Sequence, residues 1–192
     1  MKRLLKSKYF VFAVIIFIVS FIHNAGEEKI QPKQGDEMRV HFIDVGEGDA
    51  TFVEFPDGKT MLVDAGEDGE DVLSYIQKCG AEKIDFLVGT HPHSDHIGGL
   101  ETVIRNMEIG SVYMPKVTHN TATFEDLLLS IKEKGLMTNP TQKGDIIYET
   151  DGLLIEVLSP KDRKYDNLNN YSVVLKIAYG DTAFLLTGDA EA

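Results

Sequence analysis

The stretch that decides the fold of this chain is His91-Pro92-His93-Ser94-Asp95-His96, which places three imidazoles and one carboxylate side by side. It follows an apolar run over residues 84–90 that predicts a buried strand. Neutral imidazole and carboxylate are the ligands that Zn²⁺ and related divalent ions prefer. Because residues two apart at the end of a strand point to the same side, His91 and His93 can bind one ion.

The last two residues of this block come where the chain is expected to turn. Asp95 and His96 can therefore face a second ion beside the first. Gly98 and Gly99 follow, and the absence of a Cβ at both positions lets backbone approach closely as the next helix begins. The alternative is a polar loop with chance histidines, but half of the six histidines in the chain lie in this one block. The pattern therefore favours metal binding.

Strands and helices are expected to alternate around the histidine block. Strands are expected at residues 38–44, 50–55, 60–63, 84–90, 111–114, 146–149, 153–158, 172–178 and 182–187. Helices are expected at residues 71–78, 97–107 and 124–134. Meandering strands followed by alternating strands and helices predict an α/β fold, with sheets packed together and helices outside.

Composition limits the classes of partner. With 192 residues, the chain is most simply one globular domain, expected over residues 38–192. Its net charge is −12, so we expect no tight non-specific binding to nucleic acid. Bound metal ions could reverse the sign of the charge locally, so a nucleic-acid substrate is not excluded. The single cysteine, Cys79, allows no intrachain disulfide.

The N-terminal residues 1–24 have the build of an export signal. Four cations lie within the first eight residues, and residues 9–22 are almost purely apolar. Ala25 is small, but His23 lies two residues before it, where a cleavage site requires a small residue, which favours an uncleaved signal-anchor over a signal peptide. We therefore expect an exported domain, anchored to the membrane and facing outside, or secreted if the signal is cut. Residues 25–37 are polar and are expected to form a tether.

Several motifs together resemble one known family. Leu62-Val63-Asp64-Ala65-Gly66, the histidine block and Thr187-Gly188-Asp189 resemble three motifs of the metallo-β-lactamase-fold hydrolases. Two further stretches, residues 42–50 and 169–175, resemble the branch that contains the exported nuclease-like domain of ComEC, the bacterial DNA-uptake channel. The resemblance covers roughly residues 38–192. It implies a metallo-β-lactamase-type αββα sandwich.

The resemblance also implies roles for individual residues. His91 and His93 would hold the first of two divalent ions, Asp95 and His96 would hold the second, and Asp189 would bridge them. Asp95 would also be catalytic, as the group that accepts or relays a proton. Four other residues are implied as groups that orient a ligand or contact the substrate, namely Asp64, Asp49, Asn170 and Ser172.

Two departures from the family pattern affect these expectations. Many members place another ligand histidine before the bridging aspartate, whereas this chain has Asn170 and Ser172 in that region. Fewer imidazoles would favour Mn²⁺ over Zn²⁺ at the first site, and both ions stay open. The family also continues beyond the position of Ala192 with more strands, helices and a last histidine ligand. The domain is therefore expected to be partial, an αββα sandwich incomplete at its C-terminus.

The expected activity is hydrolysis by a water that two ions activate. Phosphodiesters are the substrate class that the branch resemblance favours, and another small anionic substrate is possible. Hydrolysis of a lactam, lactone or thioester by the same centre stays open. So does a different class of function, a non-catalytic, membrane-anchored metal-binding module that serves a partner.

Overall fold

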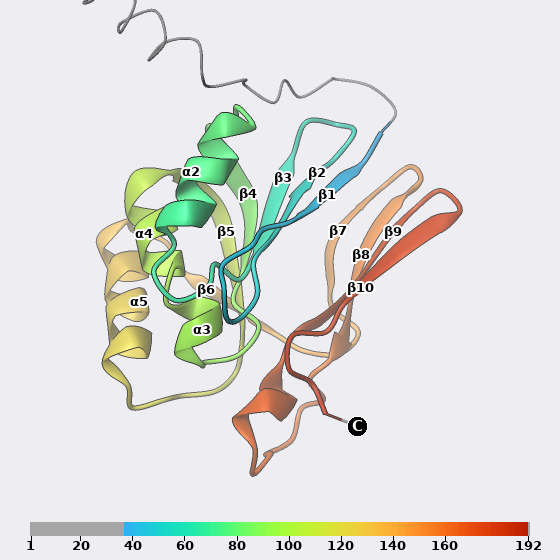
Figure 1. Ribbon diagram of the computed structural model, residues 1–192. Coiled ribbons are helices and arrows are strands. Elements are labelled where there is room, and N and C mark those ends of the chain that lie inside the picture. The colour runs from blue at the N-terminus through green and yellow to red at the C-terminus, as the bar shows by residue number, and fades with distance from the viewer. Residues whose placement is uncertain (1–36, 192) are drawn as a thin grey trace, which may run out of the picture.

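The computed structural model describes residues 37–191, which form two β-sheets packed face to face with helices against one of them (Figure 1). The larger sheet has six strands, which in spatial order are β1 (Arg39–Phe42), β2 (Thr51–Glu54), β3 (Thr60–Val63), β4 (Lys83–Val88), β5 (Glu108–Pro115) and β6 (Thr138–Thr141). Strands β1 to β3 pair antiparallel, and β3 to β6 pair parallel. The parallel half therefore ends on a common edge, where ligands usually bind in such sheets.

The smaller sheet is antiparallel throughout. Its strands, in spatial order, are β10 (Thr182–Leu186), β9 (Val174–Tyr179), β8 (Leu153–Ser159) and β7 (Ile146–Thr150). Alternate residues of β8 are buried, as expected for a strand with one face against another sheet. Val157 and Ile155 belong to the apolar cluster between the two sheets, together with Val63 and Val88 of the larger sheet.

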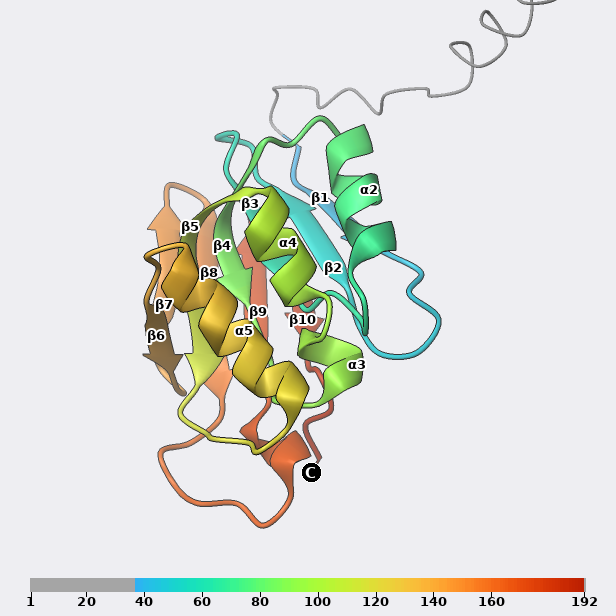
Figure 2. The ribbon, with the colours of Figure 1, turned by 90° about the vertical axis from the view of Figure 1, so that its left-hand side faces the viewer.

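Helices cover the other face of the larger sheet, as Figure 2 shows. They are α2 (Glu70–Lys78), α3 (Ser94–Ile97), α4 (Leu100–Asn106) and α5 (Ala122–Glu133). A second apolar cluster fills the space beneath them and includes Ile76, Ile104 and Leu127. A short 3₁₀ helix, η1 (Leu168–Tyr171), precedes β9. Within residues 37–191, the outer face of the smaller sheet carries no helix, so the described part contains one of the two helical layers of an αββα sandwich.

Three local predictions from sequence differ from the structure. The helix expected over residues 97–107 corresponds to α4 and begins only at Leu100, because a separate short helix, α3, ends at Ile97 and the chain turns at Gly98 and Gly99. Strand β6 was not predicted. It contains Pro140, which is tolerated here because β6 is an edge strand. Ser172 lies before β9 rather than inside it, since η1 occupies the preceding residues.

The predicted export signal over residues 1–24 and nearly all of the predicted tether over residues 25–37 lie outside the described residues. Among residues 37–191, no helix combines the length and the apolar character that crossing a membrane would require.

Candidate metal centre

The candidate metal centre lies at the edge of the sandwich where the parallel strands end. Asp64 follows β3, and His91 follows β4 after two residues. Asp49 comes just before β2, which runs antiparallel to β3, so its loop reaches the same edge. Asp189 follows β10, a strand of the smaller sheet. Segments far apart in sequence therefore meet at one place.

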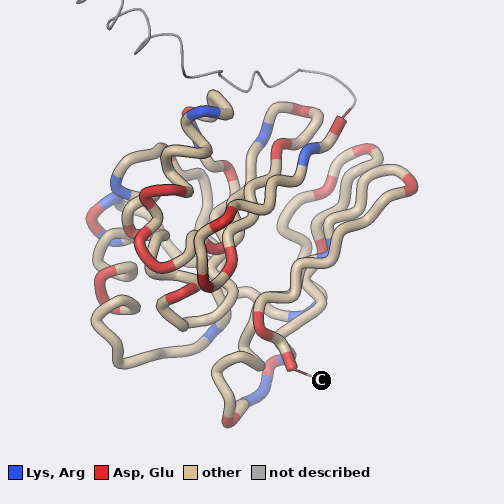
Figure 3. The backbone as a smooth tube through the Cα atoms, in the orientation of Figure 1, with Lys and Arg blue, Asp and Glu red and all other residues tan. Residues whose placement is uncertain are grey.

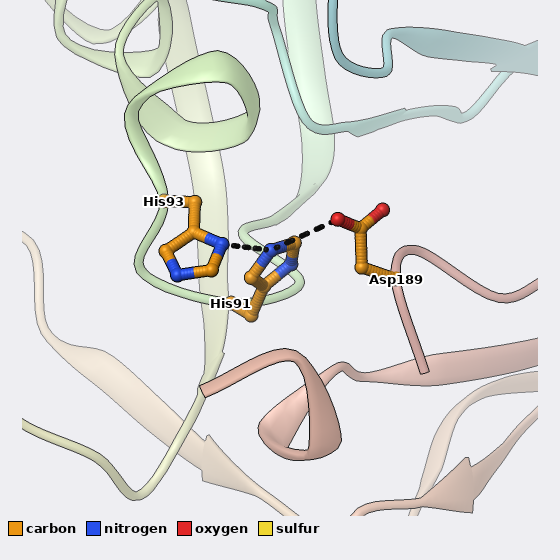
Figure 4. Close-up of side chains that lie close together, drawn as sticks. All are labelled: His91, His93 and Asp189. Atoms are coloured by element: carbon orange, nitrogen blue, oxygen red, sulfur yellow. Dashed lines mark hydrogen bonds and ion pairs between the residues drawn. The ribbon is translucent and has the colours of Figure 1, made fainter. Parts of the chain in front are cut away.

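The first group of potential ligands contains His91, His93 and Asp189 (Figure 4). His91 Nε2 lies 3.0 Å from His93 Nδ1 and 3.8 Å from Asp189 Oδ2. Two nitrogens bound to one tetrahedral Zn²⁺ at about 2.1 Å would lie about 3.4 Å apart, so the pair needs little adjustment to bind an ion. The donor types and their spacing fit a divalent metal.

The second group contains Asp49, His96 and Asp189, whose ligand atoms all lie within 4.8 Å of one another. His96 Nε2 is 3.4 Å from Asp189 Oδ1. Asp189 thus directs one carboxylate oxygen toward His91 and the other toward His96. This is the arrangement that a carboxylate bridging two ions requires.

Asp95 belongs to neither group. Its Oδ2 lies 3.6 Å from His96 Nε2, and its side chain is partly exposed. Asp49, which the sequence suggested only as an orienting or substrate-contacting residue, stands instead among the potential ligands. Asp49 Oδ2 lies 4.0 Å from His96 Nδ1, and Asp95 Oδ2 lies 3.6 Å from His96 Nε2, so the second half of the centre is rich in carboxylate oxygen.

A buried hydrogen-bond network orients the two deepest imidazoles. Asp64, which is fully buried, accepts hydrogen bonds from Thr90 N (2.8 Å), Thr90 Oγ1 (2.6 Å) and His96 Nδ1 (3.0 Å). Since the Thr90 hydroxyl donates to Asp64, its oxygen accepts from His91 Nδ1 at 3.0 Å. The Nδ1 atoms of both imidazoles therefore carry a proton, and both rings direct Nε2 toward the centre. Thr90 was not among the residues predicted for the site.

Ser172 and Asn170 hold the segment that carries Asp189. Ser172 is buried, and its Oγ accepts a hydrogen bond from Asp189 N at 3.2 Å and lies 3.4 Å from His91 Nδ1. Asn170 Oδ1 accepts from Glu191 N at 3.2 Å. Neither residue belongs to the two potential ligand groups. They fix the loop after β10 against the histidine block.

Glycine allows the loop of Asp49 to approach the histidine block. Gly48 has φ +89°, and a Cβ at this position would lie 1.7 Å from the backbone oxygen of Asp95. Any other residue would force the two segments apart and would also strain the backbone. The contact therefore fixes the distance between Asp49 and the turn that carries Asp95 and His96.

The two deep histidines differ in their affinity for protons. Burial lowers the pKa of His91 to about 4, with the nearby His96 and His93 acting in the same direction. Burial also lowers the pKa of His96, but the hydrogen bond and charge of Asp64, with the charges of Asp189 and Asp95, outweigh it and raise the pKa to about 9. Burial raises the pKa of Asp64, while the donors His96 and Thr90 oppose this. At neutral pH, an ion that binds His96 Nε2 must therefore displace a proton from it, whereas His91 Nε2 carries no proton and can bind an ion directly.

Comparison with known proteins places this site in context. Residues 43–192 match the model of the Metallo-beta-lactamase superfamily. The chain is 30% identical over 181 residues to "ComE operon protein 3" of Bacillus subtilis, covering 84% of this chain and 23% of that protein. It is also 30% identical over 107 residues to a "Ribonuclease Z" of Aeropyrum pernix, covering 46% of this chain and 34% of that protein. The chain thus spans no more than about a third of either relative.

A similar fold occurs in solved structures. The metallo-beta-lactamase fold protein YhfI from Bacillus subtilis matches with a TM-score of 0.53 at 17% identity, covering 79% of this chain and 62% of YhfI. At that identity the likeness concerns the fold alone.

Proposed function

Since this chain belongs to the metallo-beta-lactamase superfamily, we propose that it is a metal-dependent hydrolase that acts on phosphodiesters at a two-ion centre. Members of this fold are generally hydrolases and usually bind metal ions. The observation that carries the proposal is the position of Asp189, whose two carboxylate oxygens face the Nε2 atoms of His91 and His96. His91, His93 and Asp189 would hold one ion, and His96, Asp49 and Asp189 the other.

Divalent ions bound there would supply positive charge and would lower the pKa of water enough to make it a nucleophile near neutral pH. The protein's own residues would set the geometry. Thr90 and Asp64 hold the Nε2 atoms of His91 and His96 toward the centre. Asp95, partly exposed and 3.6 Å from His96 Nε2, is placed to accept a proton from water at the mouth of the site.

Two observations support phosphodiesters as the substrate class. One relative, 30% identical over 107 residues, is named Ribonuclease Z. The chain is also strongly acidic, with a net charge of −12, so an anionic substrate needs the local positive charge that bound ions would provide.

The test compares two small substrates on protein loaded with Zn²⁺ or Mn²⁺. We expect hydrolysis of bis(p-nitrophenyl) phosphate and no hydrolysis of the lactam nitrocefin. Turnover of nitrocefin alone would instead support lactam, lactone or thioester hydrolysis. Binding of ions without turnover of either substrate would support the non-catalytic metal-binding module.

Export is part of the same proposal and rests on the sequence of residues 1–24 alone. A basic start followed by an apolar stretch would direct the domain across the membrane with its positive end left inside. The test is protease treatment of intact cells that express the chain. Digestion of the domain supports an outward-facing anchor, and protection of the domain contradicts export.

A further inference from the structure

A groove of about 670 Å³ lies beside the candidate metal centre. One wall is formed by the end of β5 and the residues after it, including Lys116 and Thr118. The other wall is formed by the loop before η1 and by η1 itself, including Arg163, Lys164 and Tyr171. Figure 3 shows basic positions on this loop, at the same end of the molecule as the C-terminus.

Each wall of the groove contains a residue that directly precedes, along the chain, a residue in contact with the centre. Tyr171 precedes Ser172, whose Oγ accepts a hydrogen bond from Asp189 N. Thr118 precedes His119, whose ring lies 6.4 Å from that of His93 between centroids. His119 Nδ1 also lies 3.2 Å from the backbone oxygen of Pro92, within the histidine block. A ligand extending away from the candidate ions would therefore enter this groove.

The cations of this groove are unneutralised, which sets it apart from the other large groove of the described residues. Lys116, Arg163 and Lys164 form no ion pair within residues 37–191, and the groove contains one carboxylate, Asp162. The other groove, of about 690 Å³, lies at the opposite ends of the parallel strands. Its lysines pair with Asp85, as in the 3.3 Å contact of Lys83 Nζ with Asp85 Oδ1. Of these two grooves, the one beside the centre carries the cations that have no ion-pair partner among residues 37–191.

Two tyrosines keep the basic loop in place. The Tyr171 hydroxyl accepts a hydrogen bond from Tyr165 N at 3.1 Å, and the Tyr165 hydroxyl accepts one from Lys161 N at 3.0 Å. The Arg163 guanidinium carbon lies 4.6 Å from the centre of the Tyr165 ring, a cation–π contact. This contact places Arg163 beside the Tyr165 ring on the wall of the groove, where the guanidinium can meet an anion.

The geometry points to a binding site for a single polynucleotide strand, whose backbone phosphates contact Lys116, Arg163 and Lys164 while a neighbouring phosphodiester lies at the metal centre. Cationic grooves that follow the backbone, with aromatic residues among the cations, are the usual means of binding single strands. The inference rests on the proposed phosphodiesterase function and makes its substrate a polymer. A small phosphodiester would reach the centre without using the groove.

Strand binding can be measured without the metal centre, because the groove cations need no bound ion. The probe is a fluorescein-labelled oligothymidylate of about 12 nucleotides, titrated in EDTA at low salt and followed by fluorescence anisotropy. The variant K116Q/R163Q/K164Q should weaken binding by about tenfold or more, and should reduce the slope of log K against log salt by about 2, for three lost single-strand phosphate contacts.

The matched control removes the same charge elsewhere. Lys78, Lys132 and Lys134 are exposed on the helical layer, and the variant K78Q/K132Q/K134Q should bind the probe within about twofold of the original chain. Equal weakening in both variants, or no weakening in either, would overturn the groove assignment. The proposed function fails separately, if the metal-loaded chain binds the probe but hydrolyses neither it nor bis(p-nitrophenyl) phosphate.

Discussion

The two halves of the candidate metal centre share Asp189 but are built differently. The first half is imidazole-rich and deep: the His91 side chain has no exposed surface, and His93 lies against it. The second half is carboxylate-rich and open, with the Asp49 side chain 58% exposed and Asp95 nearby. Burial keeps the His91 imidazole neutral, with Nε2 unprotonated, whereas Asp64 favours the cationic form of His96, in which both ring nitrogens are protonated. We therefore expect the first half to bind an ion more tightly than the second.

The largest effect is expected from removing the shared carboxylate. Asp189→Asn takes one charged ligand from both halves at once, so the two ions should be lost together. Hydrolysis of bis(p-nitrophenyl) phosphate should fall about a thousandfold, the equivalent of several kcal/mol of lost charge stabilisation. Metal content after gel filtration, measured by mass spectrometry, checks the loss. Asp181→Asn, in the exposed turn between β9 and β10, is the matched control and should keep both ions.

Changing Asp64 should affect the second half more than the first. Asp64→Asn keeps the shape and suits the left-handed backbone at φ 56°, but removes the charge that accepts from His96. Loss of such an orienting partner weakens metal binding by about 10- to 100-fold. We expect this loss for the second ion and a smaller one for the first.

The same substitution should lower the free energy of unfolding of the metal-free chain. It removes one partner of a buried charged pair, and such a removal costs about 3 kcal/mol. Urea unfolding measures this change. Unchanged stability together with equal weakening of both ions would contradict the network described for Asp64.

The pH dependence should separate the two halves. The pKa of His96 is raised to about 9, so below that pH its imidazole is protonated and an ion must displace the proton. Affinity of the second half should therefore rise with pH, by up to about tenfold per unit between about pH 6 and pH 8. The pKa of His91 is lowered to about 4, so this residue adds no pH dependence to the first half in that range. Competition with a chelating dye at several pH values measures both metal affinities. If the two affinities changed equally with pH, the proposed difference between the halves would be wrong.

The smallest effect is expected from Asp49. Asp49 is exposed and is the proposed ligand of one ion only, so Asp49→Asn should weaken binding of the second ion by about tenfold and leave the first unchanged. Asp44→Asn in the same loop is the control, since an amide oxygen can still accept the hydrogen bond from Gly46 N. If Asp49→Asn behaves like Asp44→Asn in metal titrations, Asp49 is not a ligand.

The two halves of the centre also differ in how far the sequence could predict them. The family match confirms the resemblance, and the sandwich of two sheets is the expected fold. The histidine block was readable because its ligands are adjacent in the chain. The placement of Asp49 was not, because it depends on a close contact between Gly48 and the backbone of Asp95, residues distant in sequence. Thr90 was missed for a similar reason: its role appears only when Asp64 and His91 meet at the edge of the sheet.

Local errors have equally local causes. Strand β6 carries a proline that its edge position tolerates, which sequence periodicity cannot distinguish from a loop. The predicted ligand and catalytic roles of His91, His93, Asp95, His96 and Asp189 stay predictions, which the experiments above address. The structure brings all five side chains to one edge of the sandwich.

The most direct test of the two-ion centre is a crystal of the chain soaked with Mn²⁺ and measured by anomalous X-ray scattering. We predict two peaks about 3.5–4 Å apart, one bound by His91 Nε2 and His93 Nδ1 and the other by His96 and Asp49, with Asp189 bound to both. A single peak, or peaks that leave Asp189 unbound, would contradict the two-ion account.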